Sequence, residues 1–180
     1  GAQTGTILAA EDLALSIRNA ATTLGTTAGE VDMEIRYEVA DLNQALYQLR
    51  ELNIQRRDFL PGTMETAQYD EQIDGVLDQI SPIVDISSTV SSNGSVSIYT
   101  VSGAALVEGG FVQDVTFNAG DGTWMAGTQD ITPVKDGVRG IQHGSLVGLS
   151  ELKRDVIPRF KLQLDEYARG LMQTFESADA

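Results

Sequence analysis

The sequence predicts an α+β fold in which an elongated antiparallel helical bundle carries an inserted small antiparallel β region. Apolar residues recur every three or four positions from residue 8 to 80 and again from 145 to 175, which is the period of amphipathic helices. Residues 83–143 are instead rich in Gly, Ser, Thr and Val and alternate with a period of two, as strands do. The expected organisation is therefore N-terminal helices over 1–82, a β insert over 83–143 and a returning C-terminal helix over 144–180.

Three helices are expected before the insert. The first spans Leu8 to Leu24, and Gly25 is suited to end it because glycine readily adopts the left-handed conformation. The second spans Thr27 to Phe59 and ends at Pro61-Gly62, since proline lacks an amide donor and restricts the residue before it. The third begins at Thr63 or Met64 and ends at Ile80. Helices joined by such short breaks indicate an antiparallel bundle.

The returning helix begins near Ser145 and needs a partner of its own length, which we assign to the second helix. The two chain ends are then expected at the same side of the bundle. The residues expected to face the interior are Leu13, Ile17, Ala20, Ala21 and Leu24 in the first helix, Val31, Ile35, Val39, Leu42, Leu46, Leu49 and Leu52 in the second, Tyr69, Ile73, Val76, Leu77 and Ile80 in the third, and Leu146, Leu149, Leu152, Val156, Phe160, Leu164, Tyr167, Leu171 and Phe175 in the returning helix.

The insert begins with a hairpin pattern. The runs "VDISSTV" and "SVSIYTV" flank Ser92-Asn93-Gly94, and Asn-Gly favours the positive φ angles of a tight turn. Further short strands are expected at "AALVEG", "FVQDVTF" and "TWMAG", separated by glycine pairs and turns.

Composition excludes several classes of protein. With 26 acidic and 12 basic residues the chain has a net charge of −14, which disfavours nucleic acid and anionic membranes as partners. It has no cysteine, so disulfides, thiolate nucleophiles and Cys-ligated zinc are absent. No apolar run reaches the roughly 18 to 20 residues that span a bilayer. The chain starts without a methionine or a signal peptide, which favours an excised fragment.

No motif indicates catalysis. His143 is the sole histidine and stands before Gly144-Ser145, where a side chain usually caps a helix or is solvated. The segment Asn118 to Trp124 resembles a calcium loop, but Gly120 takes a ligand position and no Glu follows, so a β-turn is the preferred interpretation. Adjacent carboxylates, such as Asp70-Glu71, Asp165-Glu166 and the run Glu30, Asp32, Glu34, are expected on solvated helix faces. We therefore assign no catalytic, cofactor-binding or metal-binding residue.

Pro158 lies inside the returning helix. Because proline lacks an amide hydrogen and crowds the preceding turn, we expect a kink there or a helix whose first turns contain it.

Three stretches of the sequence carry a resemblance to one known family. One is "VADLNQALYQLRELNIQ", in which Asn43, Leu52 and Asn53 match best. Another is the order of segments from Tyr69 to Gly110, and it departs from the family at Gln72-Ile73-Asp74, where the family has Gln-Arg-Asp. The third is the run from Gly144 to Phe175, whose matching positions are Gly144, Leu146, Gly148, Leu149, Arg154, Asp155, Pro158, Leu164, Asp165 and Ala168.

Together these stretches resemble the flagellar hook-associated protein 1 family, the hook–filament junction protein of bacterial flagella. The resemblance implies a structural adaptor subunit at the hook–filament junction that is required for filament assembly, not an enzyme. It implies a secreted, extracellular location, the hook protein and the neighbouring junction protein as partners, self-assembly of the full-length protein, and an export chaperone. It needs no cofactor, nucleic acid or membrane. The family's terminal segments are missing, so we expect the isolated chain to be a monomer. The alternatives are another flagellar axial protein, such as flagellin, and a non-flagellar binding or adhesion module that uses the β insert.

Overall fold

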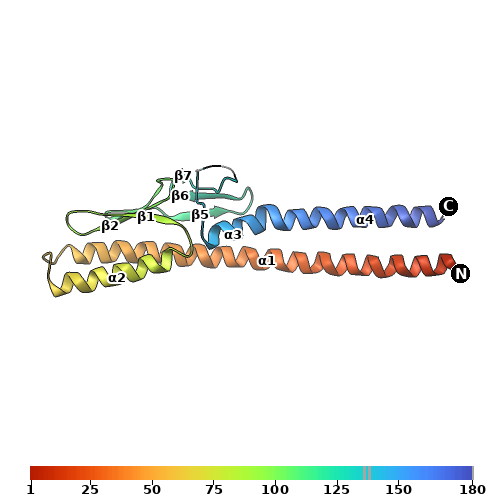
Figure 1. The fold of residues 1–180 in the computed structure, drawn as a ribbon, viewed down its shortest axis with the longest axis horizontal. Helices are drawn as coiled ribbons and strands as arrows, with labels where there is room; N and C mark the ends of the chain where they lie inside the picture. Colours follow the sequence, from red (N-terminus) through yellow and green to blue (C-terminus); the bar gives the residue numbers. More distant parts are fainter. Residues whose placement is uncertain (136, 138, 180) are drawn as a thin grey trace. The chain divides into compact units, whose positions relative to one another are not determined.

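The computed structural model describes residues 1–135, 137 and 139–179 (Figure 1). For residues 178 and 179 it describes the backbone alone. These residues form two compact units, one made of Gly1–Asp32 with the residues from Glu151 onward and the other of Met33–Ser150. The elements in chain order are α1 (Ala2–Arg56), α2 (Met64–Ile80), β1 (Ile86–Val90), β2 (Val96–Thr100), β3 (Ala105–Glu108), β4 (Phe111–Val112), β5 (Val115–Asn118), β6 (Thr123–Ala126), β7 (Gln129–Asp130), α3 (Ser145–Glu151), a π-helical turn (Leu152–Val156) and α4 (Ile157–Asp179). The α+β class with antiparallel strands is confirmed.

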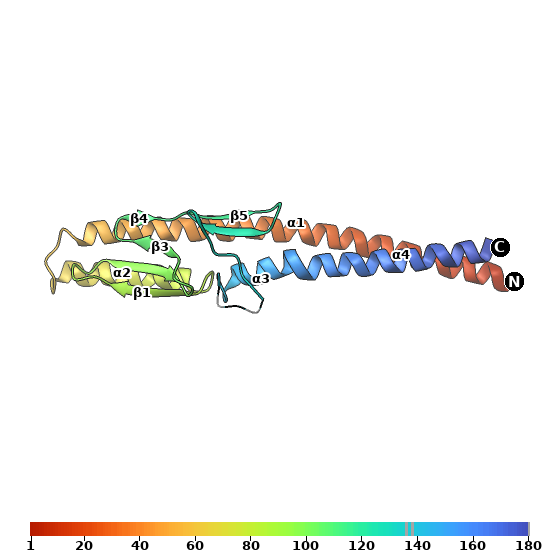
Figure 2. The same cartoon turned by 90° about the horizontal axis from the view of Figure 1, so that it is seen from above.

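The first unit is a pair of antiparallel helices. The N-terminal part of α1 lies beside α4, and the two chain ends lie at the same end of this unit (Figures 1 and 2). The side chains that contribute to the seam repeat at spacings of three and four, the pattern by which two helices keep one face together. They are Ala10, Ala14, Ile17, Leu24, Ala28 and Val31 in α1 and Leu164, Ala168, Leu171 and Phe175 in α4. Most are only half-buried, because a pair of helices covers one side of each seam residue.

Two expectations about these helices are wrong. Gly25 does not end a helix: α1 continues through it without a positive φ angle. A glycine inside a helix costs only about 1 kcal/mol relative to alanine, and the seam pattern continues on both sides of it. The partner of α4 is also not the whole Thr27–Phe59 segment but the Gly1–Asp32 part of α1, which shares only residues 27–32 with it. Lys153 of the π-helical turn forms an ion pair with Asp32 in this part.

Some residues expected in the interior are exposed. These are Leu13, Ala20, Ala21, Leu152, Phe160 and Tyr167. Phe160 and Tyr167 belong to the apolar stripe of α4 but are more than half exposed. The stripe is therefore wider than the face that one neighbouring helix covers.

In the second unit two sheets lie on one side of a layer formed by α2 and the C-terminal part of α1 (Figures 1 and 2). The first sheet has the order β1-β2-β3-β4 and the second the order β5-β6-β7. The largest fully buried side chains of this unit include Leu42, Leu46 and Leu49 from α1 and Trp124 from β6. The indole Nε1 of Trp124 donates to the Ser150 hydroxyl at 3.2 Å, so α3 closes the core of the second sheet.

The third helix and the first hairpin occur as expected. Thr63 caps α2, its hydroxyl accepting from the amide of Thr66, and α2 ends at Ile80. β1 pairs with β2 in the register Val90 to Val96. In the turn only Gly94 has a positive φ, of 80°, and Asn93 does not. The connection is therefore a three-residue loop with a glycine bulge, and the two-residue Asn-Gly turn is wrong. The later strand segments are confirmed, with "FVQDVTF" divided into β4 and β5.

Two asparagines of α1 each bond to both backbone groups of one strand residue. Asn53 Nδ2 donates to the Val96 carbonyl at 2.9 Å and its Oδ1 accepts from the Val96 amide at 2.9 Å. Asn43 makes the same pair of bonds to Val115, at 2.9 and 2.8 Å. Val96 pairs with β1 and Val115 with β6, but on the opposite side neither residue has a partner strand. The carboxamides bond the backbone groups on that side, in place of a missing strand.

We expect Asn53→Asp to weaken the attachment of β2 to α1, because one of the two hydrogen bonds to Val96 is lost. A carboxylate accepts from the Val96 amide but cannot donate to its carbonyl, which is then buried without a partner at a cost of about 1–3 kcal/mol. Hydrogen exchange at the Val96 amide is the readout, together with urea denaturation. Asn19→Asp is the matched control, since Asn19 is an exposed asparagine of the same helix. Equal effects of the two substitutions would contradict the bonding role.

Pro158 is the second residue of α4 and directly follows the π-helical turn. The Ile157 amide donates to the Leu152 carbonyl, five residues back, which is the wider π spacing. Since Pro158 has no amide to donate, a turn with a changed hydrogen-bond register accommodates it without ending the helix. Of the two expectations for this proline, the second is met, because Pro158 lies in the first turn of α4. The π turn before it was not expected.

Pro158→Ala restores an amide donor to this turn. We expect a local gain of α-helical bonding with a change in melting temperature of no more than about 4 °C, because the contacts of α4 with α1 are kept. A crystal structure of the variant with the π turn unchanged would show that the proline does not cause it.

Candidate functional site

The ends of the β insert are joined to each other by backbone hydrogen bonds. The Ser145 amide donates to the Pro82 carbonyl at 2.9 Å, and the Leu146 amide to the Ile83 carbonyl at 3.1 Å. The Asp85 amide in turn donates to the His143 carbonyl at 3.2 Å. Two amides at the start of α3, which have no partner inside the helix, are thereby satisfied by the chain that enters the insert. Entry and exit of the insert are held as one structure.

Gly144 is required by this arrangement. Its φ is 110°, and a Cβ atom at this position would lie 2.4 Å from the Ile83 carbonyl oxygen. No side chain fits between the backbone segments at Gly144 and Ile83. This close approach explains why the first position of the "GSLVGL" motif is a glycine. The adjoining Ser145 hydroxyl donates to the Glu38 carboxylate of α1 at 2.6 Å.

The residues considered for chemistry on sequence do not gather into a site. The His143 side chain is exposed. Asn118 and Asp121 use side-chain oxygens to accept from the amides of Gly120 and Thr123. The Gly122 amide donates to the Asn118 carbonyl at 2.8 Å, so this loop forms the turn between β5 and β6. Among the residues described, no group of three or more His, Asp or Glu side chains is arranged to hold a metal ion.

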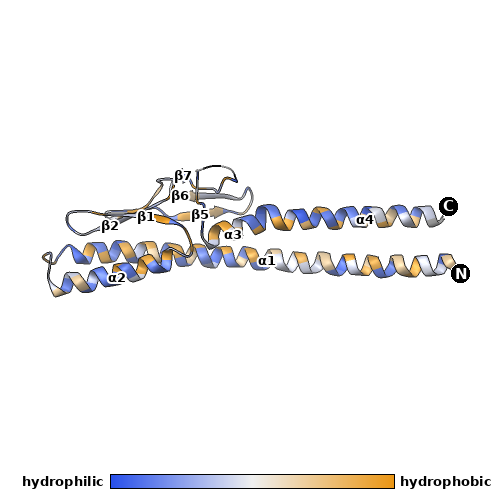
Figure 3. Cartoon of the chain, in the orientation of Figure 1, coloured by the Kyte–Doolittle hydropathy of each residue, from blue (hydrophilic) through white to orange (hydrophobic). Residues whose placement is uncertain are grey.

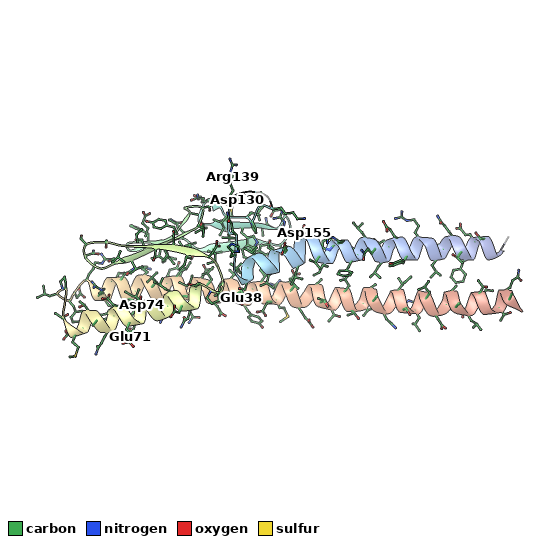
Figure 4. All side chains as sticks on the ribbon, viewed as in Figure 1. Glu38, Glu71, Asp74, Asp130, Arg139 and Asp155 are labelled. Carbon is green, nitrogen blue, oxygen red and sulfur yellow. The ribbon has the colours of Figure 1, made fainter. Side chains whose placement is uncertain are left out.

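The carboxylates lie on helix surfaces, as expected. Glu71 lies exposed on α2, together with Asp74 (Figure 4). Its sequence neighbour Asp70 accepts from Arg56 Nε at 2.6 Å, and a second Arg56 nitrogen donates to the Asn93 carbonyl at 2.8 Å. Arg56 thus joins α1, α2 and the first hairpin, and the hydrogen bond to Asp70 raises its pKa. Asp114 likewise raises the pKa of Tyr47, which favours the neutral phenol. Both shifts oppose use of the groups as proton donors in catalysis.

What the surface does offer is exposed apolar side chains. At the corner between α1 and α2, Leu60 and Met64 are each 77% exposed, and Phe59 packs on Tyr69 with ring centroids 5.5 Å apart. We name Phe59, Leu60 and Met64 the corner patch. Figure 3 shows further apolar positions recurring along the helices. Contiguous exposed apolar side chains are typical of surfaces that contact other proteins.

Sequence reasoning missed the corner patch and the bonding roles of Asn43, Asn53 and Arg56. A signal for the patch exists, because apolar residues flank the helix-breaking Pro61-Gly62, where polar ones are normal. The bonds of Asn43, Asn53 and Arg56 to the strands and the hairpin carry no such signal, since the backbone groups that accept them are about 40 or 70 residues away.

Gly144→Ala and Gly148→Ala form a matched pair. Gly148 lies on α3, and a Cβ atom added there would have no neighbouring atom within 4 Å. We expect Gly144→Ala to destabilise the protein by about 1–3 kcal/mol through strain and collision with Ile83. Gly148→Ala, in a helix, is expected to be neutral or to stabilise it by about 1 kcal/mol. Thermal denaturation of both variants tests this, and a Gly144→Ala protein as stable as wild type would contradict it.

Within the described residues, no helix is both long and apolar enough to cross a membrane. Comparison with curated proteins finds no match. Among solved structures, the chain is similar to the flagellar hook junction protein FlgK from Burkholderia pseudomallei, at 20% identity and a TM-score of 0.64. The match covers 84% of this chain and 28% of that one, so the chain spans little more than a quarter of this relative.

The similarity to that solved structure supports the fold of this chain. The family is shown by a separate comparison with a family model. The model of the flagellar hook-associated protein FlgK helical domain matches residues 1–180. The family resemblance noted in the sequence is thereby confirmed. The chain belongs to the flagellar hook-associated protein FlgK helical domain family.

Proposed function

We propose that this chain acts as a structural adaptor of the bacterial flagellum, at the junction between hook and filament, where it is required for filament assembly. The observation that carries the proposal is the family match along all 180 residues. The solved relative is a flagellar hook junction protein, which favours the same place for this chain. Its location would be extracellular, on the flagellum.

The partners we propose are the hook protein and the neighbouring junction protein, with an export chaperone before assembly and with other copies in the longer protein. The structure supports contact by packing, because apolar side chains at the corner between α1 and α2, such as Leu60 and Met64, are largely exposed. The absence of cysteine suits export of an unfolded chain. No catalytic role is proposed, because the candidate residues lie apart on exposed surfaces.

We further propose three functional segments: the helices of 1–82 and 144–180, which carry assembly contacts, and the insert 83–143, which adds surface. The insert is held to α1 by Asn43 and Asn53 and is closed at Gly144.

Immunogold electron microscopy tests the location. Antibody raised against this chain is applied to purified hook–basal bodies and to filaments. We expect label in a narrow band at the distal end of the hook. Label along the filament would indicate a flagellin-like protein, and absence of label from flagella would overturn the proposal in favour of a binding module that uses the insert.

A variant pair tests contact by the corner patch. Leu60→Asp, in the full-length protein in its own cells, places a charge on a side chain that is 77% exposed. We expect a folded, exported protein and at least about tenfold fewer filaments per cell, because a loss of roughly 1.4 kcal/mol at a contact is tenfold in its equilibrium constant. The control Val101→Asp changes another exposed apolar residue, 54% accessible and in a turn. Equal filament numbers in the two variants would exclude the patch as a contact.

A further inference from the structure

The outer edge of the first sheet is open. β1 is the terminal strand in the order β1-β2-β3-β4 and pairs on one side only. The Ser91 amide bonds to the Ser95 carbonyl of the hairpin, which sets the alternation along the strand. Ser87 and Thr89 therefore bond to β2, while Ile86, Ser88 and Val90 direct their amides and carbonyls outward. We name these three residues the β1 edge.

The fold covers comparable backbone groups elsewhere. Asn53 bonds to both groups of Val96, and Asn43 to both groups of Val115. No such side chain is bonded to the β1 edge among the described residues, and the side chains from Ser87 to Val90 are exposed. An open strand edge is a template for pairing with another strand.

The usual protections against edge pairing are also missing. Proteins discourage it with charged side chains, prolines or bulges on the edge strand. β1 pairs with β2 in an unbroken register, and no charged residue or proline occurs from Ile86 to Val107. In a chain with a net charge of −14, this stretch adds no charge of its own to an edge-to-edge contact.

We propose that the β1 edge binds the β1 edge of a second copy of this chain, antiparallel and with Ser88 on the twofold axis. In this register Ile86 faces Val90, Ser87 faces Thr89, and Ser88 faces its own copy. Every cross-strand pair is then hydroxyl with hydroxyl or β-branched with β-branched, and these pairs stabilise antiparallel strands. The three outward residues of each chain supply about six hydrogen bonds.

The proposal goes beyond the junction role and does not depend on it. A twofold contact closes on itself, so it describes pairs of the chain outside a growing assembly. One short strand pair buries less than the standard interface, so the dimer is weak and depends on concentration. It departs from the monomer expected on sequence, which rested on the missing terminal segments and not on the sheet edge.

A cysteine crosslink tests the register. The chain has no cysteine, so Ser88→Cys introduces a single thiol that meets its own copy across the axis. With oxidised glutathione as the oxidant, we expect a disulfide-linked dimer to form about tenfold or more faster than in the control, since pairing raises the effective thiol concentration. The control is Ser92→Cys, an exposed serine of the same hairpin. Equal rates in the two variants would overturn the proposal.

Charge complementation tests the contact without a covalent bond. Sedimentation velocity of the wild-type chain is expected to show an average mass that rises with concentration. Ser88→Lys and Ser88→Asp alone are expected to stay at monomer mass, because like charges face each other across the axis. Their mixture is expected to associate again, since Lys then faces Asp, and circular dichroism checks that each variant is folded. A wild-type chain that stays monomeric, or single variants that associate as wild type does, would overturn the proposal.

Discussion

The second unit depends on bonds between side-chain amides of one helix and backbone groups of two sheets. A helix uses its own backbone groups internally, so it has none left to offer a strand. A carboxamide is the side chain that presents one donor and one acceptor together, as a neighbouring strand residue does. Asn53 and Asn43 therefore let α1 complete the bonding of β2 and β5 at Val96 and Val115.

The separation of these asparagines fixes where the sheets lie on the helix. Ten residues correspond to about 15 Å along α1, and to directions about 80° apart around its axis. Leu46 and Leu49, between them, are fully buried, so the bonds and the apolar core act on the same face. A shift of either asparagine by one position would turn its amide about 100° away from the strand. Burial alone is not so specific, because apolar contact has no direction.

Sequence predicts the local elements well and their partners poorly. The limits of α2 follow from Thr63 and Ser81, and the first hairpin follows from Asn93-Gly94, because these signals act within a few residues. The partner of α4 depends instead on contacts between residues more than a hundred positions apart, such as Asp32 and Lys153, which no local signal specifies. Gly25 illustrates the same point, because a residue that often ends helices does not end α1. The apolar positions that face α4 continue beyond it, and this packing outweighs the local preference of glycine.

The charged and the neutral parts of the surface have different effects on association. Most acidic side chains of the described helices lie on the solvated sides, where the helical period places them. They keep copies of the chain apart at long range. Close contact is then left to neutral surfaces: the corner patch, with Leu60 and Met64 exposed, and the uncharged hairpin. At physiological salt the repulsion is screened beyond about 8 Å, while apolar burial and strand pairing are hardly weakened. Added salt should therefore strengthen association of this chain with its own kind, which is the opposite of what ion-paired contacts would give.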